Sequence, residues 1–168
     1  MHVYTGNGKG KSSAAFGLAL RAWGQDLRVC IIQWIKSTEY SGEFKAVSSI
    51  KGMEIRQFGA GRFFGNGAPS PEDVRLAEEG LEFAEQVLSS GDYDLVILDE
   101  LNVAVHLKLL EAEEAARVLK GRAKGVEVVV TGRYAPPIFY EISDYITEFL
   151  AVKHPFEKGM PARRGIEY

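Results

Sequence analysis

The stretch "YTGNGKGKSSAAFG", Tyr4–Gly17, decides the fold. A phosphate-binding loop usually reads Gly, four residues, then Gly-Lys-Ser or Gly-Lys-Thr. Counting back from Gly10, Lys11 and Ser12 puts Thr5 in the place of the first Gly. Because that Gly serves the turn rather than the phosphate, a Thr fits there if its backbone stays extended. The stretch predicts a loop that holds phosphate, and it leaves open which chemistry follows.

The loop has the neighbours that such a motif requires. The letters "HVYT" before it are typical of a strand, and "AAFGLALRAWG" after it of a helix. In that setting Gly6, Gly8 and Gly10 let backbone N–H groups turn toward phosphate oxygens, and the helix N-terminus favours the same negative charge. Lys11 adds a mobile cation, and the Ser12 hydroxyl is placed to ligate Mg²⁺.

Short apolar runs alternate along the chain with stretches of helical periodicity. This pattern predicts an α/β fold, a mostly parallel sheet with helices on both faces, and 168 residues fit a single domain spanning 1–168. Strands are expected at "HVYT", "RVCIIQW", "MEIRQF", "DLVILD", "VEVVVT" and "YITEFLAV". Helices are expected over residues 12–24, 71–89, 103–122 with a break near Leu110, and 137–143. Ser70 can cap the second of these helices, with Asp73 closing a capping box.

The run "DLVILDE", Asp94–Glu100, is the second half of the predicted site. A buried strand of this kind delivers the carboxylate of Asp99 to the C-terminal edge of the sheet, where it would hold Mg²⁺ opposite Ser12. The next residue, Glu100, allows two interpretations. In a hydrolase such a carboxylate activates water, whereas a protein that does not hydrolyse ATP could use it to hold the nucleotide sugar.

Two arginines are further candidates for the nucleotide. Arg21 lies on the first predicted helix and Arg133 in "VTGRYAPP", and each follows an element that starts or ends at the C-terminal edge of the sheet. Exposure to solvent is the alternative for both.

The longest irregular segment is "FGAGRFFGNGAPS", residues 58–70. Loops of this length in compact domains are usually functional or mobile. Its adjacent Phe63 and Phe64 could pack onto the body of the protein or form an apolar lid over a flat ligand.

Composition excludes several classes of protein. A formal net charge of −3 lacks the basic excess of a nucleic-acid binder, and 46% apolar with 26% charged residues is ordinary for a soluble globular chain without a membrane span. A single cysteine and a first strand that begins almost at Met1, with no leader before it, predict a cytoplasmic location.

Five stretches resemble one known family. They are "TGNGKGKSSAAFGLALRAWG", "ILDELN", "VVVTGRYAPP", "SDYITE" and "VKHPFEKGMPARRGIEY". The family is the ATP:corrinoid adenosyltransferases of cobalamin synthesis and salvage, the P-loop class of cob(I)alamin adenosyltransferase, and the resemblance covers essentially the whole chain. The Thr in place of the first Gly belongs to the pattern of this family, so Thr5 is a marker of it.

The resemblance implies a RecA-like P-loop fold, a homodimer, and transfer of the 5′-deoxyadenosyl group of ATP to the Co(I) centre of a reduced corrinoid. It also implies that triphosphate leaves, held by Mg²⁺ or Mn²⁺, and that an electron donor such as a flavoprotein reduces the corrinoid. Glu100 would contact the nucleoside, and Phe63 and Phe64 would lie by the lower face of the corrinoid. The residues that would grip the triphosphate are Gly6, Asn7, Gly8, Lys9, Gly10, Lys11, Ser12 and Ser13.

That chemistry requires no general base, because Co(I) is itself a strong nucleophile; an aligned C5′ and a stabilised leaving group suffice. Two alternatives use the same loop. A P-loop ATPase or small-molecule kinase would break the bond at the γ-phosphate. A nucleotide-gated regulatory protein would bind ATP without converting a corrinoid, and fold alone does not choose among the three.

Overall fold

The computed structural model describes residues 1–36, 41–61, 68–153 and 162–166. Six strands form one sheet in the order β3-β2-β4-β5-β1-β6, and every neighbouring pair is parallel. The strands are β1 (His2–Thr5), β2 (Val29–Trp34), β3 (Met53–Phe58), β4 (Leu95–Asp99), β5 (Glu127–Thr131) and β6 (Tyr145–Glu148). The helices are α1 (Lys11–Trp23), α2 (Gly42–Ser48), α3 (Pro71–Ser90), α4 (Leu101–His106), α5 (Ala112–Lys120) and α6 (Pro137–Glu141).

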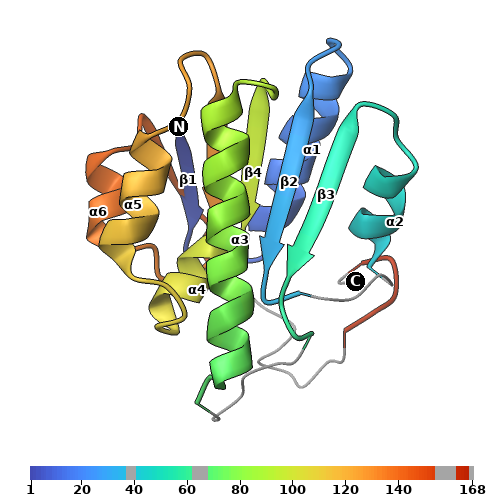
Figure 1. Cartoon of the computed structure of the whole chain (residues 1–168). Coiled ribbons are helices and arrows are strands. Elements are labelled where there is room, and N and C mark those ends of the chain that lie inside the picture. The colour runs from blue at the N-terminus through green and yellow to red at the C-terminus, as the bar shows by residue number, and fades with distance from the viewer. Residues whose placement is uncertain (37–40, 62–67, 154–161, 167–168) are drawn as a thin grey trace.

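Helices cover both faces of the sheet, as predicted. In Figure 1 the long α3 crosses in front of the sheet and α1 lies behind it. The two faces have separate cores: residues of α1 and α2 pack with alternate strand residues such as Ile31 and Ile97. Residues of α3, α4, α5 and α6 pack with the other set, including Ile32 and Leu98. The α/β fold of a P-loop protein is thereby confirmed.

The strand order decides which chain segments meet at the site. Strand β5 lies between β1, which leads into the phosphate loop, and β4, which ends at Asp99. Because all strands run in the same direction, the C-terminal ends of β1, β2, β4 and β5 gather at one edge of the sheet. The residues that end these strands can therefore touch although they are far apart in the sequence.

Local signals fix the helix ends. The predicted capping box at the start of α3 is present, since the Ser70 hydroxyl accepts the Asp73 amide while the Asp73 carboxylate accepts the Ser70 amide. The predicted break near Leu110 is also present, between the end of α4 and the start of α5. Within the described ranges, none of the helices combines the length and the hydropathy that a membrane crossing requires.

The structure corrects the sequence interpretation in two places. Helix α2 was not predicted, because it has only 7 residues and begins at Gly42. The sequence did contain a start signal for this helix, a serine at position 41 followed by Glu43 in the first turn. In the structure the Ser41 hydroxyl accepts the Phe44 amide over 3.2 Å. The last strand is shorter than expected, because β6 ends at Glu148 rather than continuing to Val152.

Candidate active site

The phosphate loop connects β1 to α1. Thr5 ends the strand with extended backbone, so a side chain is tolerated where the usual motif has Gly. The turn into the helix is made at Gly10, whose φ of 113° suits only a residue without a Cβ. The Lys11 ammonium donates to the carbonyls of Gly6 and Gly8 over 2.8 and 2.7 Å, so its charge lies inside the loop.

The loop packs against the chain that follows β6. The Gly8 amide donates to the Phe149 carbonyl over 2.6 Å, and the Phe149 amide donates to the Thr5 carbonyl over 2.8 Å. A Cβ on Gly8 would approach the backbone of Leu150 to 2.7 Å. In this structure Gly8 thus serves close packing, and its N–H points at Phe149 rather than at a phosphate position.

Asp99 ends β4, and its carboxylate is completely buried. Its Oδ1 accepts the Thr131 hydroxyl over 2.7 Å, and its Oδ2 accepts the Gln33 amide and the Lys36 ammonium over 2.9 and 3.0 Å. The Ser12 hydroxyl lies close enough to this carboxylate to contribute to its lowered pKa. The expected meeting of Ser12 and Asp99 at the edge of the sheet is therefore present.

The charges around Asp99 keep it ionised. Burial acts to raise the pKa of the Asp99 carboxyl, but the charge of Lys36, the hydrogen bonds from Thr131 and Gln33, and the nearby Ser12 hydroxyl outweigh it and lower the pKa. Burial likewise acts to lower the pKa of Lys36, and the Asp99 carboxylate overcomes it and raises the pKa. Both groups are therefore charged at neutral pH.

Glu100 is the second carboxylate of the site. It begins α4 with left-handed backbone, φ 65°, and its amide donates to the Thr131 Oγ1 over 3.1 Å. A Cβ on Gly132 would lie 3.2 Å from Glu100 Oε2, so the carboxylate rests against the turn after β5. Burial raises the pKa of Glu100 and the Asp99 charge raises it further, while Lys36 and other nearby cations act in the opposite direction.

Several residues of the site were not found from the sequence. Gln33 is held by Gln57, which donates to its Oε1 over 2.9 Å, so a polar chain runs across β3, β2 and β4 to Asp99. The sequence contained a signal for this polar chain, since the glutamine in the apolar run "RVCIIQW" requires a hydrogen-bond partner when it is buried.

Asn102 is another buried polar residue that sequence reasoning left out. Its Nδ2 donates to the Gly132 carbonyl over 3.0 Å and to the Tyr4 carbonyl over 3.4 Å, which ties β1 to the turn after β5. Among the described residues, its Oδ1 has no hydrogen-bond partner.

The remaining predicted residues divide into those the fold brings to the loop and those it does not. The Arg133 guanidinium donates to the Asn7 carbonyl over 3.3 Å, so this arginine lies at the loop. Arg21 lies in the last turn of α1, ten residues and about 15 Å along the axis from Lys11. The structure does not bring it to the loop. Phe63 and Phe64 lie outside the described residues.

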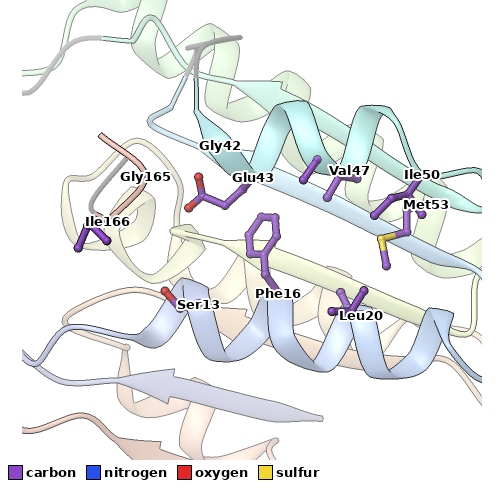
Figure 2. Close-up of a pocket in the computed structure, with 12 residues that line it drawn as sticks. Ser13, Phe16, Leu20, Gly42, Glu43, Val47, Ile50, Met53, Gly165 and Ile166 are labelled. Carbon is purple, nitrogen blue, oxygen red and sulfur yellow. The ribbon is translucent and has the colours of Figure 1, made fainter. Parts of the chain in front are cut away.

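A groove of about 400 Å³ opens beside the loop, between α1 and α2. Figure 2 shows Phe16 pointing into this groove from α1, with Val47 on the α2 side and Met53 at the far end. Ser13, directly after the predicted metal ligand, lines the end nearest the loop, and so does Ile166. The carbonyl of Ile166 accepts the Lys9 ammonium over 3.2 Å, so loop, groove and the Gly165–Ile166 segment adjoin.

The donor set around Asp99 suits a hard divalent cation. Ser12 and Asp99 offer one hydroxyl and one carboxylate that lie near each other. No group of three or more His, Cys, Asp or Glu side chains that could hold a metal occurs in the part of the chain that the structure describes. Mg²⁺ typically takes one or two protein oxygens and completes its shell with phosphate oxygens and water, which these residues fit.

Comparison with known proteins agrees with this geometry. A "Corrinoid adenosyltransferase" of Pseudomonas aeruginosa is 37% identical over 167 residues, which are 99% of this chain and 82% of the relative. One of Escherichia coli K12 is 36% identical over 166 residues, 99% of this chain and 84% of the relative. The "Corrinoid adenosyltransferase CobA" of Salmonella typhimurium is 34% identical over 166 residues, with 99% and 84% covered. The sequence profile of ATP:corrinoid adenosyltransferase BtuR/CobO/CobP matches residues 1–168, and the chain belongs to this family.

Proposed function

We propose that this protein transfers the 5′-deoxyadenosyl group of ATP to the Co(I) centre of a reduced corrinoid and releases triphosphate. The single observation that carries the proposal is the meeting of the phosphate loop with the buried Asp99 in a chain that belongs to the adenosyltransferase family throughout its length. An ATPase or kinase reading of the same loop is not favoured, because the named relatives are adenosyltransferases.

In the proposed reaction Co(I) attacks C5′ of the ribose, the C5′–O bond breaks, and the electron pair leaves with the triphosphate. The residues of the chain then have two tasks, alignment and stabilisation of the leaving group. Lys11 lies inside the loop and supplies the closest cation, and Arg133 supplies a second at the rim. The loop residues from Gly6 to Ser13 would surround the phosphates, and Gly8, whose amide donates to Phe149, would contribute to the shape of the loop rather than an N–H.

Ser12 and Asp99 would hold Mg²⁺ or Mn²⁺. When bound, the divalent cation neutralises charge on the triphosphate oxygens. Asp99 can serve this role because it is ionised and fixed by neighbours on two adjacent strands. Glu100 would contact the nucleoside, and its position against Gly132 keeps it beside Asp99 at the same edge of the sheet.

The corrinoid would be met by the loop that contains Phe63 and Phe64, whose apolar rings would keep water from the cobalt and ease its reduction. We further propose a single-domain chain that acts as a homodimer in the cytoplasm and receives a corrinoid reduced by an electron donor such as a flavoprotein. The homodimer and the electron donor rest on the family resemblance, whereas the single domain and the location rest on length and composition. A net charge of −3 gives no reason to add a nucleic acid to the partners.

An anaerobic spectroscopic assay tests the proposal. Protein mixed with Mg-ATP and chemically reduced cobalamin should give the spectrum of an alkylated corrinoid, and light should abolish that spectrum. A mixture without ATP is the control and should show no such change. An unchanged spectrum in the complete mixture, with ATP consumed, would contradict the proposal.

A further inference from the structure

The Asp99 oxygen that faces Lys36, Oδ2, already accepts two hydrogen bonds. Three side chains donate to the carboxylate: Thr131 on Oδ1, and Gln33 and Lys36 on Oδ2. A carboxylate offers about four lone-pair positions, two on each oxygen. A cation that binds Oδ2 must therefore replace one of the two donors already present there.

The neutral donors are fixed in place. Gln33 is completely buried near the end of β2 and is itself held by Gln57 over 2.9 Å. Thr131 is completely buried at the end of β5 and also accepts the Glu100 amide. Moving either side chain would leave a buried polar group unpaired.

Lys36 differs from these donors in position and charge. It follows β2 in an irregular segment, and its side chain is 32% exposed, whereas the Asp99 side chain is 0% exposed. It is also the donor that a divalent cation repels, since both are positive. The carboxylates of Glu43 and Glu100 act on its charge as well, so Lys36 keeps negatively charged neighbours when it leaves Asp99.

We propose that Lys36 is a placeholder cation, which neutralises Asp99 while the site is empty and yields this position to the divalent cation that arrives with the triphosphate. The proposal rests on the metal role proposed for Ser12 and Asp99. It follows that free metal competes with an ammonium group already 3.0 Å from Asp99 Oδ2, whereas the metal–nucleotide complex brings compensating negative charge. Lys36 is thus a positioning residue that couples metal binding to nucleotide binding.

Mn²⁺ binding to the nucleotide-free protein, followed by electron paramagnetic resonance, tests this role apart from activity. Lys36→Met removes the ammonium, and we expect the variant to bind free Mn²⁺ at least tenfold more tightly than the parent. Lys36→Gln retains a neutral donor and should also bind free Mn²⁺ more tightly, because the charge of Lys36 is what excludes the metal. This variant provides the test if Lys36→Met does not fold. Mg²⁺ alone should raise the melting temperature of these variants and leave that of the parent unchanged.

Lys124→Met is the matched control, since this exposed lysine precedes β5 at the opposite edge of the sheet; its Mn²⁺ affinity should equal that of the parent. Lys36 variants that bind free Mn²⁺ no better than the parent would overturn the placeholder role.

Asp99→Asn distinguishes a failure of the placeholder role from a failure of the proposed metal site. If Asp99→Asn weakens binding of the Mn²⁺–ATP complex while the Lys36 variants gain nothing, only the placeholder role fails. If Asp99→Asn has no effect on that binding, the proposed metal site fails together with it.

Discussion

The Thr131 hydroxyl donates to Asp99 Oδ1 over 2.7 Å, and its oxygen accepts the Glu100 amide over 3.1 Å. One side chain of β5 thus fixes both acidic residues at the end of β4. We expect Thr131→Val to lower the free energy of unfolding by about 1–3 kcal/mol, because it leaves buried polar groups unpaired. Urea unfolding measures this, with Thr147→Val on the exposed β6 as control, expected within about 0.5 kcal/mol of the parent. Equal losses in the two variants would contradict the role of Thr131.

The close approach of the loop to Leu150 gives a second prediction. A Cβ on Gly8 would lie 2.7 Å from backbone atoms of Leu150, so Gly8→Ala must push the two segments apart. We expect a loss of about 1–3 kcal/mol in unfolding free energy and weaker ATP binding. Gly17→Ala is the matched control, since a Cβ there meets nothing within 4 Å and Ala favours a helix by about 1 kcal/mol. Calorimetry that finds both variants equally stable would refute the packing argument.

The sequence allowed the phosphate loop and Asp99 to be predicted because each is a local pattern, a Gly-rich turn after a strand and a carboxylate that ends an apolar run. The parts that it did not reveal depend on contacts between distant segments. Gln33 and Asp99 are 66 positions apart, and the Gly8 amide meets Phe149 only because β6 pairs with β1. Helical periodicity likewise predicted long helices such as α3 and missed the 7 residues of α2, which end before a repeat is visible.

Lys11 lies within the loop, where the leaving triphosphate would develop its charge. We expect Lys11→Ala to lower kcat and kcat/KM for adenosylation by about 10²–10³-fold each, because the interaction is strongest in the transition state. The rate of corrinoid adenosylation under anaerobic conditions measures the effect, with Lys124→Ala as a remote control. Because Lys11 also bonds the carbonyls of Gly6 and Gly8, the melting temperature must be recorded alongside. An unchanged turnover in a folded variant would remove Lys11 from the mechanism.

Glu100 makes stability depend on pH in a known direction. Burial and the Asp99 charge raise its pKa above the ordinary value of 4.5, so the folded protein favours the protonated form. Stability from this group is therefore present below 4.5 and is lost as pH rises through the raised pKa, by about 1.4 kcal/mol for each tenfold change in proton affinity. Asp99 acts in the opposite sense, because its lowered pKa adds stability that is lost only on acidification below 3.8.

Glu100→Gln should accordingly be more stable than the parent at pH 7, and the two should converge near pH 4.5. Urea unfolding at a series of pH values measures the difference. A constant difference across that range would mean that the Glu100 carboxyl titrates as it does in the unfolded chain.

The identity of the product released from ATP tests the central claim most directly. Phosphorus NMR of the anaerobic reaction with reduced cobalamin distinguishes attack at C5′ from attack at the γ-phosphate. Adenosyl transfer predicts one inorganic triphosphate for each adenosylated corrinoid, with no ADP. Formation of ADP and free phosphate, without an adenosylated corrinoid, would contradict it.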